Sequence, residues 1–267
     1  MDNFVAGALA GAITTIAMHP LELAKTRLQL GHSASLKSSL GEMRRGSLVA
    51  AYRGLLPNLI GNAVAWGAYF YAYETVQRFA FGPPLNLNKS AQTYLYCSFV
   101  AGILTQVATN PIWVIKTQIL GAKSGDKEAP STIGKAAALI YRKWGIGGFW
   151  RGFVPGTMGT VQSAIYFGMY SPMKPYLKQR LGLSDTATYF ISSAFCKLVS
   201  ATLMYPHQVV KSQMQYTGVS MGTAISEILS KDGWKGFYRG LSANLARVVP
   251  AMTVTLVTYE NLKKLLA

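Results

Sequence analysis

One short motif occurs three times along the chain, and its first copy reads Pro20-Leu-Glu-Leu-Ala-Lys25. The second copy is Pro111-Ile-Trp-Val-Ile-Lys116 and the third is Pro206-His-Gln-Val-Val-Lys211, so a lysine follows each proline at the same spacing. A proline inside a helix removes a backbone hydrogen bond and clashes with the preceding turn, so each copy predicts a helix kink. Recurrence at intervals of roughly 90 residues predicts three similar repeats.

Two further signals recur once in each repeat, one on either side of an apolar stretch. The first opens the stretch and appears as Tyr52-Arg53-Gly54, Trp150-Arg151-Gly152 and Tyr238-Arg239-Gly240. The second closes it and appears as Tyr73-Glu74-x-x-Gln77, Tyr170-Ser171-x-x-Lys174 and Tyr259-Glu260-x-x-Lys263. The same three signals in the same order indicate that each repeat holds two long helices joined by a polar segment.

The composition narrows the class of protein. Of the 267 residues, 50% are hydrophobic and only 13% are charged, with 26 Lys and Arg against 10 Asp and Glu. A disordered basic tail would be poor in apolar residues, and a soluble nucleic-acid-binding domain would carry denser charge. Because long uncharged stretches separate the charges, we expect no nucleic-acid partner. We expect instead a membrane protein with cationic loops or a cationic pathway.

Six stretches are free of charge or nearly so, and each is about as long as a membrane span requires. They are Asn3–Leu21, Gly54–Tyr73, Ser90–Ile115, Gly152–Met173, Thr186–Val210 and Gly240–Tyr259. Gly, Ser, Thr, Asn and Gln are scattered through them, which is typical of helices with one face on a water-filled cavity. We predict an all-α integral membrane fold of six transmembrane helices in three pseudo-threefold repeats, residues 1–87, 88–183 and 184–267. Both termini then lie on one side, and longer basic loops with short helices lie on the other.

The sequence lacks the patterns of an enzyme or a metal site. It contains no nucleophile–base pair, no paired catalytic carboxylates and no phosphate-binding glycine loop, and its histidines offer no ligand spacing. Cys97 and Cys196 lie in apolar stretches, so they form neither a disulfide framework nor a metal-ligand set. We therefore predict no catalytic activity, no prosthetic group and no metal.

Three symmetry-related kinks would draw three helix ends together, so charged residues just beyond the prolines would face one another. A ring of ion pairs there could close one end of a central cavity, and a second ring at the far helix ends could close the other, which would allow alternating access. Lys197 and Arg247 interrupt spans near their middles, where an ionisable residue is a candidate functional site. Snorkelling or a structural pair is the alternative. Because both are cations, the expected ligand is an anion, and the fork of Arg247 suits phosphate or carboxylate.

These three motifs resemble those of the mitochondrial carrier family, the solute carriers of the mitochondrial inner membrane, over essentially the whole chain. The resemblance implies a monomer in a bilayer containing cardiolipin, with both termini toward the intermembrane space. It also implies a gate on the matrix side and a gate on the cytoplasmic side. The matrix gate comprises Glu22, Lys25, Lys116, Gln208 and Lys211, and the cytoplasmic gate comprises Glu74, Gln77, Lys174, Glu260 and Lys263.

The gates depart from the family pattern because neutral residues replace several acids. Trp113 and Gln208 stand where the second and third copies of the proline motif would carry an acid, and Ser171 does so in the cytoplasmic motif. Family pairing implies that Glu22 bridges Lys116, that Gln208 hydrogen-bonds Lys25, and that Lys211 faces Trp113, where a cation–π contact could form. On the other side Glu74 would bridge Lys174, Glu260 would meet Gln77, and Lys263 would lack an acid. Both gates are expected to be weak.

The resemblance also implies where substrate binds. The family contact points on the even-numbered helices correspond to Gly61-Asn62, Gly159-Thr160 and Arg247-Val248. The sequence around Asn62, Trp113 and Lys197 resembles the flavin and folate branch of the family, so FAD or a related flavin or folate is the expected transported substrate. Trp113 would either stack on a flat heteroaromatic ring or pack in the closed gate. Alternatives are a folate, pyrimidine-nucleotide or NAD carrier, or a membrane scaffold that does not transport.

Overall fold

The computed structural model describes residues 2–45, 51–82, 91–122, 129–182 and 184–266, and all regular structure in these residues is helical. The long helices are α1 (Asp2–Gln29), α4 (Leu55–Phe81), α5 (Ala91–Gly121), α7 (Phe153–Leu181), α8 (Asp185–Leu203), α9 (Tyr205–Thr217) and α11 (Leu241–Leu266). Shorter elements are α2 (Leu36–Arg45), α6 (Ile133–Trp144), α10 (Met221–Asp232) and two 3₁₀ turns, η1 (Ile146–Trp150) and η2 (Gly233–Tyr238). The predicted all-helical class is confirmed.

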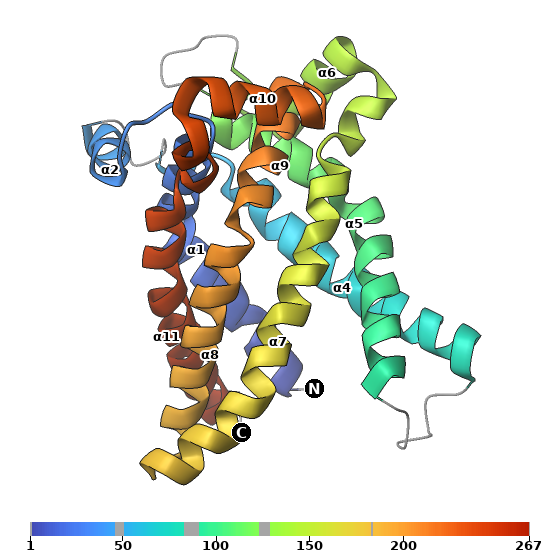
Figure 1. Cartoon of the computed structure of the whole chain (residues 1–267), viewed down its shortest axis with the longest axis vertical. Helices are drawn as coiled ribbons and strands as arrows, with labels where there is room; N and C mark the ends of the chain where they lie inside the picture. Colours follow the sequence, from blue (N-terminus) through green and yellow to red (C-terminus); the bar gives the residue numbers. More distant parts are fainter. Residues whose placement is uncertain (1, 46–50, 83–90, 123–128, 183, 267) are drawn as a thin grey trace.

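The long helices run roughly along one direction, and the short ones cap one end (Figure 1). α1 packs against α11, α4 against α5, and α7 against α8. The start of α1 and the end of α11 lie toward the end opposite to α2, α6 and α10 (Figure 1). Away from the capped end, α4 and α5 lean away from α7 and α8. We call the two ends of the molecule the capped end and the open end.

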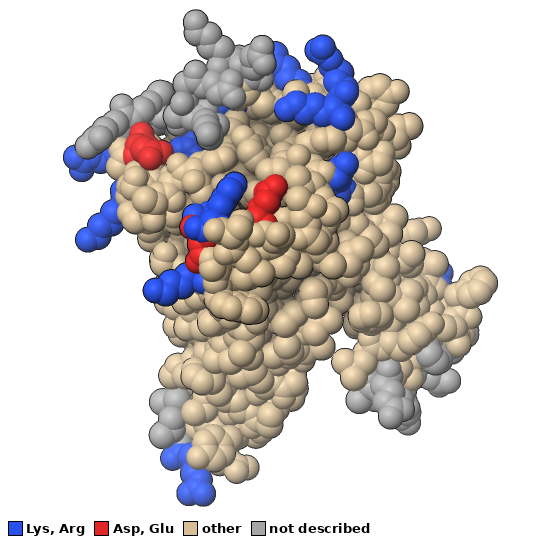
Figure 2. All heavy atoms as spheres, turned by 45° about the horizontal axis from the view of Figure 1, so that its top comes forward, with Lys and Arg blue, Asp and Glu red and all other residues tan. Residues whose placement is uncertain are grey.

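Charge is concentrated at the ends of the molecule. Figure 2 shows lysine and arginine side chains gathered over the capped end, a few more at the opposite tip, and a broad uncharged band between them. Large apolar side chains are exposed on the long helices, among them Leu95, Phe99 and Leu104 on α5. Soluble proteins rarely expose a continuous apolar surface of this kind, whereas a bilayer covers it.

Among the residues that the structure describes, two segments are long and apolar enough by composition to cross a membrane, Thr93–Gly121 and Met221–Tyr259. A third qualifies if α8 and α9, which are bent by 59° relative to each other, form a single span. This is fewer than the six spans expected from the uncharged stretches. The other long helices carry many Gly, Ser, Thr, Asn and Gln residues, which lower their mean hydropathy although charges are scarce.

The three motif prolines occupy two different local structures. Pro20 and Pro111 lie inside the continuous helices α1 and α5, whereas Pro206 lies in the first turn of α9, just after the break from α8. A first-turn proline loses no helical hydrogen bond, so the chain bends most easily there. The predicted kink is therefore a break at Pro206, and the helix continues through the other two prolines.

The residue before each motif proline contacts the Arg-Gly turn of its own repeat. His19 Nε2 lies 3.0 Å from the carbonyl oxygen of Arg53, and Asn110 Nδ2 donates to the carbonyl oxygen of Arg151 at 3.2 Å. Tyr205 is fully buried, and its hydroxyl lies 3.0 Å from the position that a Cβ on Gly240 would occupy. Three different side chains thus make corresponding contacts, and each ties the proline region to the start of the next long helix.

The glycines of the three Arg-Gly turns make a closed cycle of contacts. Gly54, Gly152 and Gly240 all have positive φ, at 78°, 72° and 79°, which side chains other than glycine's rarely adopt. The site of a Cβ on Gly54 would overlap Leu120 of α5, and that of Gly152 would lie 2.9 Å from Gln215 of α9. The corresponding site on Gly240 would lie 2.9 Å from the carbonyl oxygen of Lys25 in α1. Each turn therefore packs on the proline-containing helix of another repeat.

Gly240→Ala is predicted to destabilise the protein by about 1–3 kcal/mol, because alanine is strained at positive φ and its methyl group would press on a backbone oxygen. The measurement is the thermal unfolding midpoint of the purified protein in detergent. The matched control is Gly222→Ala on α10, where the added methyl group meets nothing within 4 Å. Equal midpoints for the two variants would contradict the packing role of Gly240.

Candidate functional site

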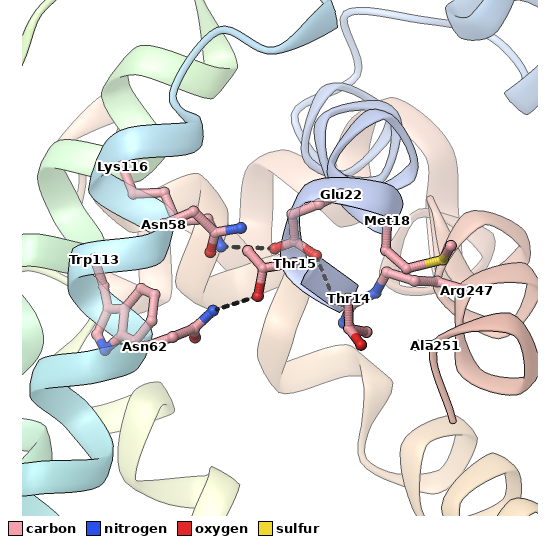
Figure 3. Close-up of a pocket in the computed structure, with 10 residues that line it drawn as sticks. All are labelled: Thr14, Thr15, Met18, Glu22, Asn58, Asn62, Trp113, Lys116, Arg247 and Ala251. Carbon is pink, nitrogen blue, oxygen red and sulfur yellow. Dashed lines mark hydrogen bonds and ion pairs between the residues drawn. The ribbon is translucent and has the colours of Figure 1, made fainter. Parts of the chain in front are cut away.

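A polar pocket lies among α1, α4, α5 and α11 (Figure 3). The residues that line it are Thr14, Thr15, Met18, Glu22, Asn58, Asn62, Trp113, Lys116, Arg247 and Ala251. They combine two cations, one carboxylate, two amides and an indole ring. We call this the central pocket. Its chemistry offers charge to an anion, amide groups to a heterocycle edge and a flat surface to an aromatic ring.

Glu22 holds two cations from different helices. Its Oε1 lies 2.7 Å from Lys116 Nζ of α5, and its Oε2 lies 3.1 Å from Arg247 Nη1 of α11. The Glu22 and Lys116 side chains are largely buried, at 12% and 13% exposed, whereas Arg247 is 35% exposed. The ion pair expected between Glu22 and Lys116 is present. The Arg247 pair was missed, because the expected gate pairing gives Glu22 one partner and nothing in the sequence places α11 beside it.

A second pocket lies toward the capped end, next to the first, and we call it the gate pocket. It shares Glu22, Trp113 and Lys116 with the central pocket. Its other lining residues are Lys25, Thr26, Gln29, Gln106, Thr117, Gly156, Gly159, Gln162, His207, Gln208, Lys211, Ser212 and Gln215. Glu22, Trp113 and Lys116 therefore form the boundary between the two pockets.

Neutral amides replace carboxylates within the gate pocket. Lys25 Nζ donates to Gln208 Oε1 at 2.9 Å, which is the expected gate contact, and Gln208 Nε2 donates to Gln162 Oε1 at 3.2 Å. The aromatic contact differs from the expectation. Lys116, rather than Lys211, lies over the Trp113 ring, with its Nζ 5.2 Å from the ring centroid. Lys116 follows Trp113 by three positions on α5, so the two side chains share a helix face.

A buried layer of hydrogen bonds joins the helices on the capped side of the gate pocket. Gln29 donates to the Tyr205 hydroxyl at 3.0 Å and accepts from Ser212 at 2.8 Å. Thr117 donates to Gln215 Oε1 at 2.8 Å, and Gln118 Nε2 donates to the Gln215 carbonyl oxygen at 2.9 Å. These contacts join α1 to α9 and α5 to α9, so the capped end is sealed across the repeats by hydrogen bonds as well as by charge.

The open end lacks the cross-helix pair that was expected there. In the part of the chain that the structure describes, Glu74 pairs with Arg78 one turn along α4, and Lys174 donates to the Tyr189 hydroxyl. The predicted Glu74–Lys174 pair is therefore wrong for this conformation, because α4 leans away from α7 at this end (Figure 1). The side chains of Glu260 and Lys263 lie outside the described residues, and Gln77 is half-buried on α4.

The remaining expected substrate contacts divide into two groups. Asn62 Nδ2 donates to Thr15 Oγ1 at 3.4 Å in the central pocket, and Gly61 leaves room for Trp113, whose ring lies 3.0 Å from where a Cβ would stand. Gly159 lines the gate pocket. Neither pocket lining includes the two other residues, Thr160 and Lys197.

The two residues outside the pockets have contacts of their own. Thr160 points its methyl group at Gly102 of α5 and donates to the Thr157 carbonyl oxygen at 2.6 Å. Lys197 has an exposed side chain, with its Nζ 5.9 Å from the centroid of the Tyr166 ring. Lys197 is also near enough to Arg247 for the two charges to repel.

Comparison with known proteins gives a family match along nearly the whole chain. The sequence model described as "Mitochondrial carrier protein" matches residues 1–83, 88–181 and 183–267. A mitochondrial FAD carrier protein of Saccharomyces cerevisiae is 34% identical, over 97% of this chain and 95% of its own length. A chloroplastic nicotinamide adenine dinucleotide transporter of Arabidopsis thaliana is 33% identical, covering 99% and 91%, and a chloroplastic folate transporter of the same plant is 32% identical, covering 99% and 95%.

Glu22→Gln is predicted to lower the stability of the closed capped end by about 3–5 kcal/mol, because removing one partner leaves the other charges buried and uncompensated. The measurement is again the thermal unfolding midpoint in detergent. Glu74→Gln is the matched control, since it breaks an exposed pair within one helix worth about 0.3–0.5 kcal/mol. A Glu22→Gln midpoint as high as that of the control would contradict the central role of this carboxylate.

Proposed function

Because the chain belongs to the mitochondrial carrier family, whose members are transporters, we propose that it carries FAD across the mitochondrial inner membrane by alternating access. The observation that carries this proposal is the central pocket, which places Arg247, the Trp113 indole and two asparagine amides around one space. The similarity to the yeast FAD carrier supports the choice of substrate.

The proposed membrane arrangement has six spans in three repeats, residues 1–87, 88–183 and 184–267. The three family matches have nearly the same boundaries, and the cyclic packing of the Arg-Gly turns supports threefold pseudosymmetry. The uncharged band supports a membrane-embedded body (Figure 2). With the basic capped end toward the matrix, both termini face the intermembrane space. One chain encloses both pockets, so we propose that a monomer is sufficient.

The central pocket has groups suited to each part of a flavin nucleotide. Arg247 would bind a phosphate oxygen through its guanidinium fork, and Trp113 would stack on the flat ring. Asn58 and Asn62 present both donors and acceptors, which suits the edge of a heterocycle. FAD is here the transported substrate and not a resident cofactor.

Substrate binding would act on the gate through Glu22. A phosphate that engages Arg247 competes with Glu22 for the same guanidinium, and the Arg247 side chain, which is 35% exposed, lines the central pocket. Glu22 would then retain Lys116 alone, and the charge balance that holds α1, α5 and α11 together would weaken. Binding of the anion thus favours release of the capped end, as a ligand that prefers the open-gate state must do.

NAD and folate are alternative assignments for the substrate, and a specific observation supports each. The chloroplastic NAD and folate transporters are nearly as similar to this chain as the yeast FAD carrier is. All three molecules combine negative charge with a flat heteroaromatic ring, so the same pocket chemistry suits each of them. Direct transport measurements decide among them.

Purified protein in proteoliposomes is predicted to take up FAD faster than NAD or folate, and Arg247→Ala is predicted to reduce FAD uptake about 10–100-fold. The estimate reflects loss of a charge-assisted hydrogen bond worth about 1.5–3 kcal/mol. Lys231→Ala, on the exposed surface of α10, is the matched control and should transport normally. Faster NAD or folate uptake would reassign the substrate, and normal uptake by Arg247→Ala would reject the site.

Gln208→Asp is predicted to slow transport about fivefold. The new carboxylate would pair with Lys25 and stabilise the closed gate by about 1 kcal/mol, so the gate would open less readily. The measurement is the initial rate of uptake into proteoliposomes, with Gln208→Asn as the control of equal length and no charge. A faster rate for Gln208→Asp than for the control would show that a weak gate does not set the rate.

A further inference from the structure

The gate pocket has a large excess of positive charge. Lys25, Lys116 and Lys211 line it, and Glu22 is the only carboxylate among its described lining residues. The three lysines lie near enough to one another for their charges to repel. Such an arrangement calls for further negative charge, because clustered cations away from bulk water are unfavourable without a partner.

Glu22 cannot neutralise this cluster. One of its oxygens contacts Lys116 and the other contacts Arg247, so both are engaged by cations. Lys25 receives only the neutral amide oxygen of Gln208. Among the described residues, Lys211 forms no ion pair and no hydrogen bond to an acceptor. Two ammonium groups of the gate pocket therefore lack a carboxylate.

The surroundings of Lys211 supply a second hydrogen-bond donor at the wall of the gate pocket. The position of a Cβ on Gly156 of α7 would be 3.3 Å from Lys211 Nζ and 2.7 Å from Gln106 Nε2. Gln106 uses one amide hydrogen on Asn110 Oδ1 at 2.7 Å, and the second hydrogen is left for another acceptor. An ammonium group and an amide N–H thus converge where the helix has no side chain.

We propose that the gate pocket binds a phosphate-class oxyanion between Lys25 and Lys211, beside Gly156 and Gln106. The bound oxyanion supplies the negative charge that Trp113 and Gln208 do not. Several oxygens on one centre can accept hydrogen bonds from separate donors, and lysine binds phosphate well as a point charge. The occupant is either free inorganic phosphate or a phosphate group of a transported nucleotide. The site does not depend on which cofactor the protein carries.

The test is binding of inorganic phosphate to the purified full-length protein without flavin present, at constant ionic strength maintained with potassium chloride. Saturating phosphate is expected to raise the thermal unfolding midpoint by about 2–4 °C, because it binds the folded state. Equilibrium binding of radiolabelled phosphate gives a second reading that does not depend on the stability of any variant. If chloride raised the thermal unfolding midpoint as much as phosphate does, the proposal would be overturned.

Four variants locate the site. Lys211→Gln and Gly156→Ala should each reduce phosphate binding at least tenfold, the first by removing a charge and the second because its methyl group would displace the Gln106 amide and crowd Lys211. Lys211→Arg should keep the binding, and Lys231→Gln on α10 should leave it unchanged. Wild-type phosphate binding by both Lys211→Gln and Gly156→Ala would place any bound phosphate elsewhere and overturn the proposal.

The source of the anion is read from the same assay with FAD added. Loss of phosphate binding in the presence of FAD would identify a phosphate group of the nucleotide as the natural occupant. Phosphate binding that persists when FAD is bound would identify a free anion that seals the gate. Failure of FAD uptake in proteoliposomes would reject the proposed substrate and leave the phosphate measurement intact, so the two proposals fail separately.

Discussion

A single carboxylate, Glu22, partly balances the cations that line the central pocket and the gate pocket. It contacts Lys116 on α5 and Arg247 on α11 from its own position on α1, so three helices far apart in the sequence meet on one side chain. Lys25 and Lys211 add two further cations to the same space. A change in the partners of Glu22 therefore changes how these helices are held together. A ligand in the central pocket can cause such a change, because Arg247 lines that pocket.

The two ends of the molecule are held by contacts of different range. At the capped end, the ion pairs of Glu22 and the buried hydrogen bonds of Gln29 and Gln118 join helices of different repeats. At the open end, Glu74 pairs within α4, and Lys178 of α7 pairs with Asp185 at the start of α8, 2.6 Å away. These two pairs at the open end join residues that are close together in the chain, so they do not form a ring of contacts across the helices. Among the side chains that the structure describes, the seal in this conformation lies at the capped end.

The resemblance to the carrier family predicts two contacts between copies of the repeated motif, the Glu22–Lys116 ion pair and the Lys25–Gln208 hydrogen bond, and the structure contains both. Contacts that depend on the tilt of the helices cannot be predicted from the repeated motif. The Arg247–Glu22 pair needs α11 beside α1, and the absence of a Glu74–Lys174 pair follows from the tilt of α4. Likewise, nothing in the spacing indicates that Thr160 packs against Gly102 and not in a pocket.

The packing of α1 has a consequence for how the chain acquires its structure. The main partner of α1 is α11, and the Gly240 turn before α11 rests on the backbone of α1 at Lys25. α1 therefore lacks its main partner until α11 is in place. Contacts of such high sequence separation slow folding, because a long loop must close before they form. A chain truncated before α11 would leave α1 without its main neighbour, so the docking of α11 is the step that completes the packing of α1.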